Sequence, residues 1–319
     1  MSEENIDLSA APTEETQAKS AAAEPTRKKP EKKAKEKKFK EGRRIKTLPP
    51  LTVLTPFIMK KRNDALNYYS DSIQIDAAEA YIAKKRAEGY TGFGLMHVFL
   101  AAYVRTVAEK PGINRFIRGQ RIYARNNIEI CLTIKKEMSA NSPDVVVKFF
   151  PKADATAVDI YNEVNSAIEA SRATDDSDLE GVMNFLVKLP TGILRTAISF
   201  LTLLDYYKLL PRSLTKLSPF HGSYFITSMG SLGIKPIYHH IYNFGNVPVF
   251  TSIGTKYKEN FIKNDGTVET RRMVDFKVVT DERICDGFYY ASTFKSMMFY
   301  IKHPDLLDNP PAEVLADVD

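Results

Sequence analysis

A short stretch of this sequence gathers charged side chains where a strand should meet a helix. It spans 281–287 and follows 276–280, a β-branched run typical of a strand, and apolar residues recur at helical spacing after it. A strand-to-helix corner holds its side chains in fixed positions, so these charged residues are candidates for a functional site. A plainer interpretation is that Asp286 caps the helix or pairs with an arginine, and that Gly287 takes up the bend.

Residues 281–287 read Asp-Glu-Arg-Ile-Cys-Asp-Gly. This segment resembles the Asp-His-Arg-x-x-Asp-Gly signature of the dihydrolipoamide acyltransferases, the core subunits of 2-oxoacid dehydrogenase complexes, whose fold chloramphenicol acetyltransferase shares. The resemblance extends over about 51–307, with a Pro-x-x-Asn at 111–114 and a segment at 226–230 similar to the family's Ile-Ser-x-x-Gly loop. It departs from the family at Glu282, which stands where the family has its catalytic histidine.

The resemblance implies an α/β fold: a two-layer sandwich of the CoA-dependent acyltransferase type, with a mixed sheet and packed helices. The order of strand and helix patterns along the chain agrees with such a sandwich. Strands are predicted at 68–75, 121–124, 128–134, 145–150, 222–228, 247–254 and 276–280, and helices at 77–88, 91–110, 157–173 and after 287.

In this family an acyl group passes between coenzyme A and a dihydrolipoamide thiol. A histidine takes the thiol proton, and a serine or threonine hydroxyl donates a hydrogen bond to the tetrahedral oxyanion. The resemblance therefore implies that Thr227 is the oxyanion donor, that Asp286 is a structural acid partnered by Arg62, and that Glu282 occupies the position of the base. The family sets these groups across a subunit boundary, which implies a homotrimer.

Glutamate is a poor base for a thiol. The ordinary pKa of a glutamate carboxyl lies about four pKa units below that of a thiol. Transfer of the thiol proton to glutamate is therefore unfavourable by on the order of 6 kcal/mol. Burial of Glu282 would narrow this gap. His239 and His240, in a stretch that matches the one before the family's next strand, are alternative bases, although a histidine that is satisfied or faces solvent is the commoner outcome.

Two functions remain open. The first is a CoA-dependent acyltransferase that moves an acyl group from acyl-CoA to a small-molecule or carrier thiol acceptor, with dehydrogenase-complex subunits as further partners. The second is a catalytically inactive trimeric core or scaffold subunit. The substitution at Glu282 favours the second, as does the chain before residue 47, which is too short and polar to fold as a lipoyl domain. We therefore expect no bound lipoyl group, and no metal, because Cys and His spacings fit no metal site.

The chain divides into a charged tail at 1–46, predicted to be disordered, and an acyltransferase-like domain at 47–319. Within the tail, 27–46 carries twelve Lys or Arg against three Glu, a net charge of +9. The folded remainder is nearly neutral. Because no aromatic residues are interleaved with these cations in a pattern for base stacking, we expect no specific nucleic-acid binding.

An apolar insertion interrupts the domain at about 175–220. A membrane span needs about 20 nearly uncharged residues, and Lys188, Arg195 and Asp205 break this run. We therefore predict a pair of amphipathic helices packed on the domain or on a neighbouring subunit. Lying on a membrane surface is the alternative, but the overall expectation is no membrane association.

The chain opens with an acidic segment without an apolar run, so no secretory signal is recognised. Its two cysteines, Cys131 and Cys285, lie far apart and fit small core residues. These features favour a cytoplasmic location.

Overall fold

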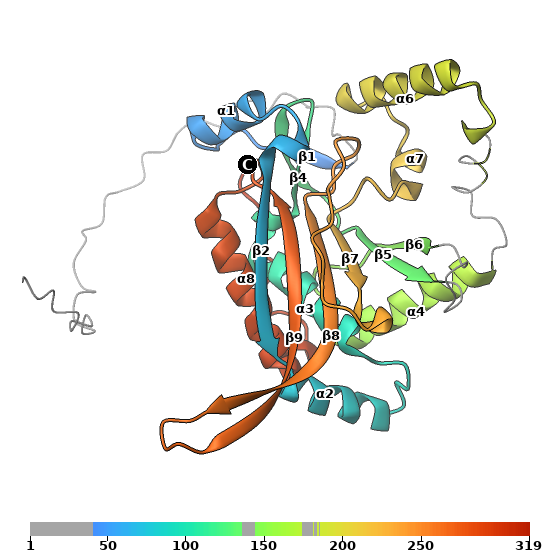
Figure 1. Ribbon diagram of the computed structural model, residues 1–319. Helices are drawn as coiled ribbons and strands as arrows, with labels where there is room; N and C mark the ends of the chain where they lie inside the picture. The colour runs from blue at the N-terminus through green and yellow to red at the C-terminus, as the bar shows by residue number, and fades with distance from the viewer. Residues whose placement is uncertain (1–40, 136–143, 174–180, 182–183, 185) are drawn as a thin grey trace, which may run out of the picture. The chain divides into compact units, whose positions relative to one another are not determined.

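The computed structural model describes residues 41–135, 144–173, 181, 184 and 186–319. Its centre is a six-stranded sheet (Figure 1). The strands, in the spatial order β2-β9-β8-β7-β5-β6, are β2 (Leu66–Gln74), β9 (Val268–Asp281), β8 (Val249–Ile262), β7 (Tyr224–Ser228), β5 (Ile130–Lys135) and β6 (Asp144–Phe149). β7 pairs in parallel with β5 and β8, and the other pairings are antiparallel. The predicted mixed sheet is therefore confirmed.

Helices cover one face of this sheet (Figure 1). They are α2 (Asp76–Ala87), α3 (Leu95–Glu109), α4 (Ala157–Ala173) and α8 (Gly287–Lys302), with short 3-10 turns at Arg62–Ala65, Pro111–Asn114, Gly230–Leu232 and Pro304–Asp308. α3 is apolar nearly all round, and every residue from His97 to Ala108 is buried. A helix of that kind must be enclosed on all sides, and α3 forms the centre of the core between the sheet and its neighbours.

A second sheet has three short strands in the order β1-β4-β3: β1 (Gly42–Arg44), β4 (Arg121–Arg125) and β3 (Arg115–Arg118). The predicted domain start at residue 47 was therefore too late. Gly42 lets β1 pair closely with β4, since a Cβ there would lie 2.4 Å from the carbonyl oxygen of Ala124. Glu41 and Ile45 on either side of β1 are buried. Residues 1–40, the rest of the predicted tail, lie outside the described residues.

Three further helices have described bounds. α1 (Pro50–Ile58) was not predicted; Pro50 sits at its first helical position, where its missing N–H costs nothing. The insertion forms α6 (Thr191–Tyr206) and α7 (Arg212–Leu217), which confirms the helical pair in its described part. No described helix is long and apolar enough to cross a bilayer.

Candidate active site

Asp281 ends β9 and binds two arginines in the protein interior. Its carboxylate accepts hydrogen bonds from Nε of Arg62 at 3.2 Å and from Nε and Nη2 of Arg283 at 2.8 and 2.7 Å. All three side chains are at least 96% buried. The guanidinium groups also donate to the carbonyl oxygens of Gly245 and Met59. This buried cluster fixes the strand end, because each of its charges is both paired and hydrogen-bonded.

The expected pair between Asp286 and Arg62 is wrong. Arg62 directly precedes β2, and Leu66 of β2 lies opposite Asp281 in the sheet, so the strand register delivers Arg62 to Asp281. Asp286 is instead exposed and caps α8, where its Oδ1 accepts a hydrogen bond from the backbone N–H of Tyr289 at 2.8 Å. The plainer interpretation, a helix cap, is therefore confirmed for Asp286.

The expectation that Gly287 takes up the bend is also wrong. Gly287 is the first residue of α8, it has no positive φ, and a Cβ added there would meet no atom within 4 Å. The turn is set by the cap at Asp286 and by the buried residues before it, Ile284 and Cys285.

Glu282 points out of the protein. Its side chain is exposed, and its backbone N–H donates to the carbonyl oxygen of Ala65 at 2.8 Å. Arg283, the next residue in the chain, pairs with Asp281 and not with Glu282. No ion pair to Glu282 forms among the described side chains. The burial that a carboxylate base would need is not provided by this chain alone.

Thr227 lies near the end of β7 on the sheet face that the helices leave uncovered. Tyr224 and Ile226 point into the core, so the strand alternation sends Thr227 and Phe225 to the opposite face. Thr227 is only 6% exposed, and its register partner in β8 is Ser252. A hydroxyl held at a buried strand end is well fixed for donating a hydrogen bond.

His239 lies over the same face. Its ring stacks on Phe250 with centroids 4.5 Å apart, and Phe250 stacks on Phe225, two residues before Thr227, at 4.4 Å. Nε2 of His239 is buried and has no hydrogen-bond partner in the described part of the chain. Burial, and secondarily the neighbouring His240, lower the pKa of His239 below its ordinary value. The ring is therefore neutral at neutral pH and able to accept a proton. His240 is exposed.

Thr227 and Glu282 of the same chain are too far apart to act on one substrate. Thr227 lies opposite Ser252, Ser252 lies opposite Lys277, and Lys277 comes five residues before Glu282. Two strand spacings and five residues of strand place their Cα atoms roughly 20 Å apart. The chain thus places His239 on the same sheet face as Thr227 and leaves Glu282 far from Thr227. Sequence spacing could not show this, because it depends on sheet register.

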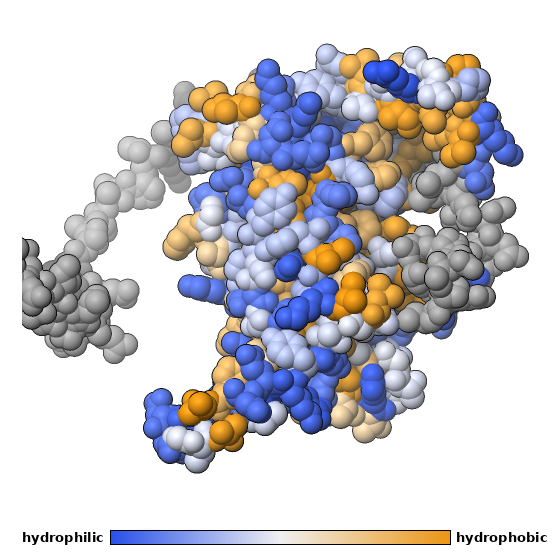
Figure 2. All heavy atoms as spheres, viewed as in Figure 1, coloured by the Kyte–Doolittle hydropathy of each residue, from blue (hydrophilic) through white to orange (hydrophobic). Residues whose placement is uncertain are grey.

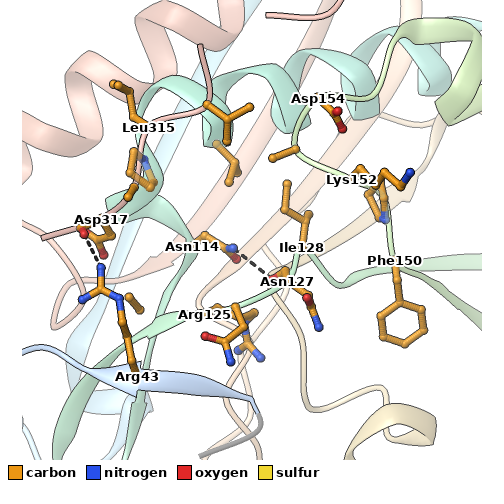
Figure 3. A pocket seen from close by; sticks show the side chains of 18 of the residues that line it. Arg43, Asn114, Arg125, Asn127, Ile128, Phe150, Lys152, Asp154, Leu315 and Asp317 are labelled. Atoms are coloured by element: carbon orange, nitrogen blue, oxygen red, sulfur yellow. Dashed lines mark hydrogen bonds between the residues drawn. The ribbon is translucent and has the colours of Figure 1, made fainter. Parts of the chain in front are cut away.

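A cavity of about 610 Å³ lies elsewhere, between the end of α3, β4, the segment after β6 and the C-terminal segment (Figure 3). Asn114 of the Pro-x-x-Asn segment lines it and donates from Nδ2 to the carbonyl oxygen of Asn127 at 3.2 Å. Thr227, His239 and Glu282 do not line this cavity.

Both cysteines are buried, and burial raises the pKa of each thiol. The prediction that they are core residues is confirmed, since neither is placed to act as a thiolate. Among the described residues, no three His, Cys, Asp or Glu side chains gather closely enough to hold a metal ion.

Comparison with known proteins gives a fold and no closer relationship. No family model matches the chain, and no curated protein matches it. Among solved structures, a probable dihydrolipoamide acetyltransferase from Listeria monocytogenes 4b F2365 matches with a TM-score of 0.51 and 17% identity, over 81% of this chain and 94% of that one. The dihydrolipoamide acetyltransferase of Azotobacter vinelandii matches with a TM-score of 0.52 and 14% identity, over 82% and 93%.

The chain has the fold of a dihydrolipoamide acetyltransferase core. The predicted acyltransferase-type sandwich is therefore confirmed. A chloramphenicol acetyltransferase also matches, with a TM-score of 0.46 and 14% identity, over 79% of this chain and 94% of that one. In the Azotobacter protein, a serine, a histidine and an asparagine have been investigated for their role in catalysis. The identities are low enough that the likeness concerns the fold alone.

Proposed function

We propose that this protein is a CoA-dependent acyltransferase, with acyl-CoA as donor and a small-molecule or carrier thiol as acceptor. The observation that supports it is the pairing of a buried hydroxyl, Thr227, with a neutral histidine, His239, on one uncovered sheet face. A neutral imidazole with a vacant ring nitrogen suits proton transfer near neutral pH. A fixed hydroxyl on the same sheet face suits stabilisation of an oxyanion.

In the proposed reaction His239 takes the proton from the acceptor thiol, and the thiolate attacks the thioester carbonyl of acyl-CoA. The hydroxyl of Thr227 donates a hydrogen bond to the oxyanion that forms. Collapse of this intermediate breaks the bond to the CoA sulfur, which takes up the proton from His239. Charge is conserved at every step, and no metal or lipoyl group on this chain is required.

We propose that the working unit is a homotrimer. The segment that follows β7 carries the exposed apolar side chains Leu232, Ile234 and Ile237, and the backbone N–H of Ile237 donates to Oγ of Ser252, the register partner of Thr227. An apolar surface around a polar site is typical of a subunit interface. Subunits of a dehydrogenase complex would be further partners if the acceptor thiol is carried on another protein.

The second candidate function is a non-catalytic scaffold with the same fold. The observation that favours it is Glu282, which is exposed and lies roughly 20 Å from Thr227. A carboxylate in that position is a weak base, and a chain that had lost its catalytic histidine would keep the fold and the apolar interface.

Thiol release from a panel of acyl-CoAs tests the proposal. Thr227→Ala should lower turnover by about 100-fold to 1000-fold, and His239→Ala by about 100-fold or more. His240→Ala is the matched control, because His240 is adjacent but exposed, and it should retain activity. Loss of turnover in Glu282→Gln with retention in His239→Ala would reassign the base to Glu282. If a well-folded protein neither binds nor turns over any acyl-CoA, the result would contradict the acyltransferase proposal and support the scaffold function.

A further inference from the structure

Two helices far apart in the sequence contact the same turn at one end of the domain. Gln120, in the turn between β3 and β4, donates from Nε2 to the carbonyl oxygen of Pro56 in α1 at 3.4 Å. Its Oε1 accepts a hydrogen bond from the hydroxyl of Tyr206 in α6 at 2.8 Å. α1 and α6 therefore flank the same turn, and both lie at the upper end of the view in Figure 1.

α6 is anchored by one face only. Leu194, Ala197, Leu201 and Leu204 recur at helical spacing and are half-buried. At the end of the helix, Asp205 is buried and pairs with Arg118 at 3.0 Å and with His221 at 3.2 Å, both distances being between nitrogen and carboxylate oxygen. These contacts hold α6 on the domain and fix which side faces outward.

The outward sides of both helices are apolar. In α6, Ile193, Phe200 and Leu203 form a stripe and are 56%, 57% and 52% exposed. In α1, the stripe consists of Leu51, Leu54 and Ile58, which are 72%, 55% and 73% exposed. Apolar residues gather on both helices in the space-filling view (Figure 2). Exposed stripes of this size on a protein surface indicate that something covers them.

The two segments of the chain that carry these stripes are rich in basic residues. The segment 42–61, which contains α1, has five Lys or Arg and no Asp or Glu. The segment 186–217, which contains α6 and α7, has five Lys or Arg and a single acid, the buried Asp205. Exposed members include Lys60, Lys61, Lys188 and Arg195.

From this combination we infer that the end of the domain formed by α1 and α6 docks on an anionic lipid bilayer. A bilayer surface offers an apolar layer beneath negatively charged headgroups, and amphipathic helices with basic surroundings lie in that interface. The apolar stripes enter the headgroup boundary, and the exposed cations of the two segments contact the headgroups. This inference departs from the sequence-based expectation of no membrane association and takes up the alternative of a helix lying on a membrane surface.

Co-sedimentation of the full chain with vesicles tests this inference. We expect binding to phosphatidylcholine vesicles that contain phosphatidylglycerol, weakening as salt is raised, and little binding to pure phosphatidylcholine. The double variant Phe200→Ser, Leu203→Ser should bind about tenfold more weakly or worse. The matched control is Ile262→Ser, Val268→Ser at the tip of the β8–β9 hairpin, whose side chains are 79% and 63% exposed. It should bind like the natural protein.

Three results would overturn the inference. The first is a natural chain that does not sediment with anionic vesicles. The second is an α6 double variant that binds as well as the hairpin control. The third is an α6 double variant that changes the oligomeric mass measured by light scattering, which would assign the stripes to a second copy of the chain. Because all of these substitutions lie at exposed positions, thermal unfolding should show that both double variants fold.

Discussion

At the scale of single residues, two adjacent acids have opposite environments. Asp281 is 1% exposed and carries two arginines, whereas Glu282 faces solvent. The difference follows from the end of β9, where the register against β2 brings Arg62 to Asp281. The residue that keeps the corner in shape is thus the acid before Glu282 in the chain, and Asp286 is the helix cap.

Removing the charge of Asp281 should therefore be costly. Asp281→Asn leaves Arg62 and Arg283 buried without a counter-charge, and we expect a loss of about 3 to 5 kcal/mol in the free energy of unfolding. Urea denaturation measures this loss. Asp286→Asn is the control, because asparagine caps a helix as well as aspartate does, and its effect should stay below about 1 kcal/mol. Equal losses in the two variants would contradict the assignment.

At the scale of elements, buried ion pairs join β1 and the inserted helices to the domain. Glu41, next to β1, accepts hydrogen bonds from Arg118 at 2.5 Å and from Arg125 at 2.8 Å. Arg118 also pairs with Asp205 of α6, so one arginine connects β1 and α6. Apolar packing alone does not explain how these elements attach, because each presents few buried apolar residues.

This cluster predicts acid sensitivity. Burial alone would raise the pKa of Glu41, but Arg125, Arg118 and the amide of Asn246 outweigh it and lower the pKa from 4.5 to about 2. Because the folded pKa is the lower one, the stabilisation is present above pH 4.5 and is lost as the pH falls toward 2. The difference corresponds to about 3 kcal/mol.

Denaturant unfolding at a series of pH values checks this expectation. The free energy of unfolding of the natural protein should fall between about pH 5 and pH 2. Glu41→Gln should be less stable at neutral pH, because Arg118 and Arg125 lose their counter-charge, and part of the acid dependence should disappear. An unchanged slope in Glu41→Gln would show that other carboxylates cause the acid dependence.

At the scale of the whole molecule, the proposed homotrimer allows two placements of the base that serves Thr227. His239 belongs to the same chain and the same sheet face as Thr227, whereas Glu282 can reach Thr227 only from another subunit. The two alternatives therefore predict different behaviour in trimers assembled from two defective variants.

Trimers refolded from an equal mixture of Thr227→Ala and His239→Ala chains should stay inactive, because no chain then carries both groups. If His239 acted on Thr227 of a neighbouring subunit, random assembly would restore about one site in four. If Glu282 of a neighbouring subunit were the base, the His239→Ala chains would stay active, and about half of the sites would work. Natural chains mixed with Thr227→Ala chains are the control and should keep about half of the activity. Recovery of activity in the first mixture would contradict a Thr227–His239 pair within one chain.

The sequence by itself predicted much of this protein. Strand and helix periodicity located the main elements, and the corner at 281–287 with the Thr227 segment indicated the acyltransferase fold. These signals are local, because burial on one face imposes a period of two or 3.6 on neighbouring residues. α1 was missed because its prolines suggest a loop, and β1 because its surroundings are highly charged.

Only the tertiary structure decided which of these residues act together. It pairs Arg62 with Asp281, stacks His239 over the face that holds Thr227, and leaves Glu282 exposed. The physical reason is that these relations depend on the register between strands and on burial by distant segments. A shift of one residue in the register of a strand reverses which side chains share a face of the sheet. The spacing of residues along the sequence does not determine this register.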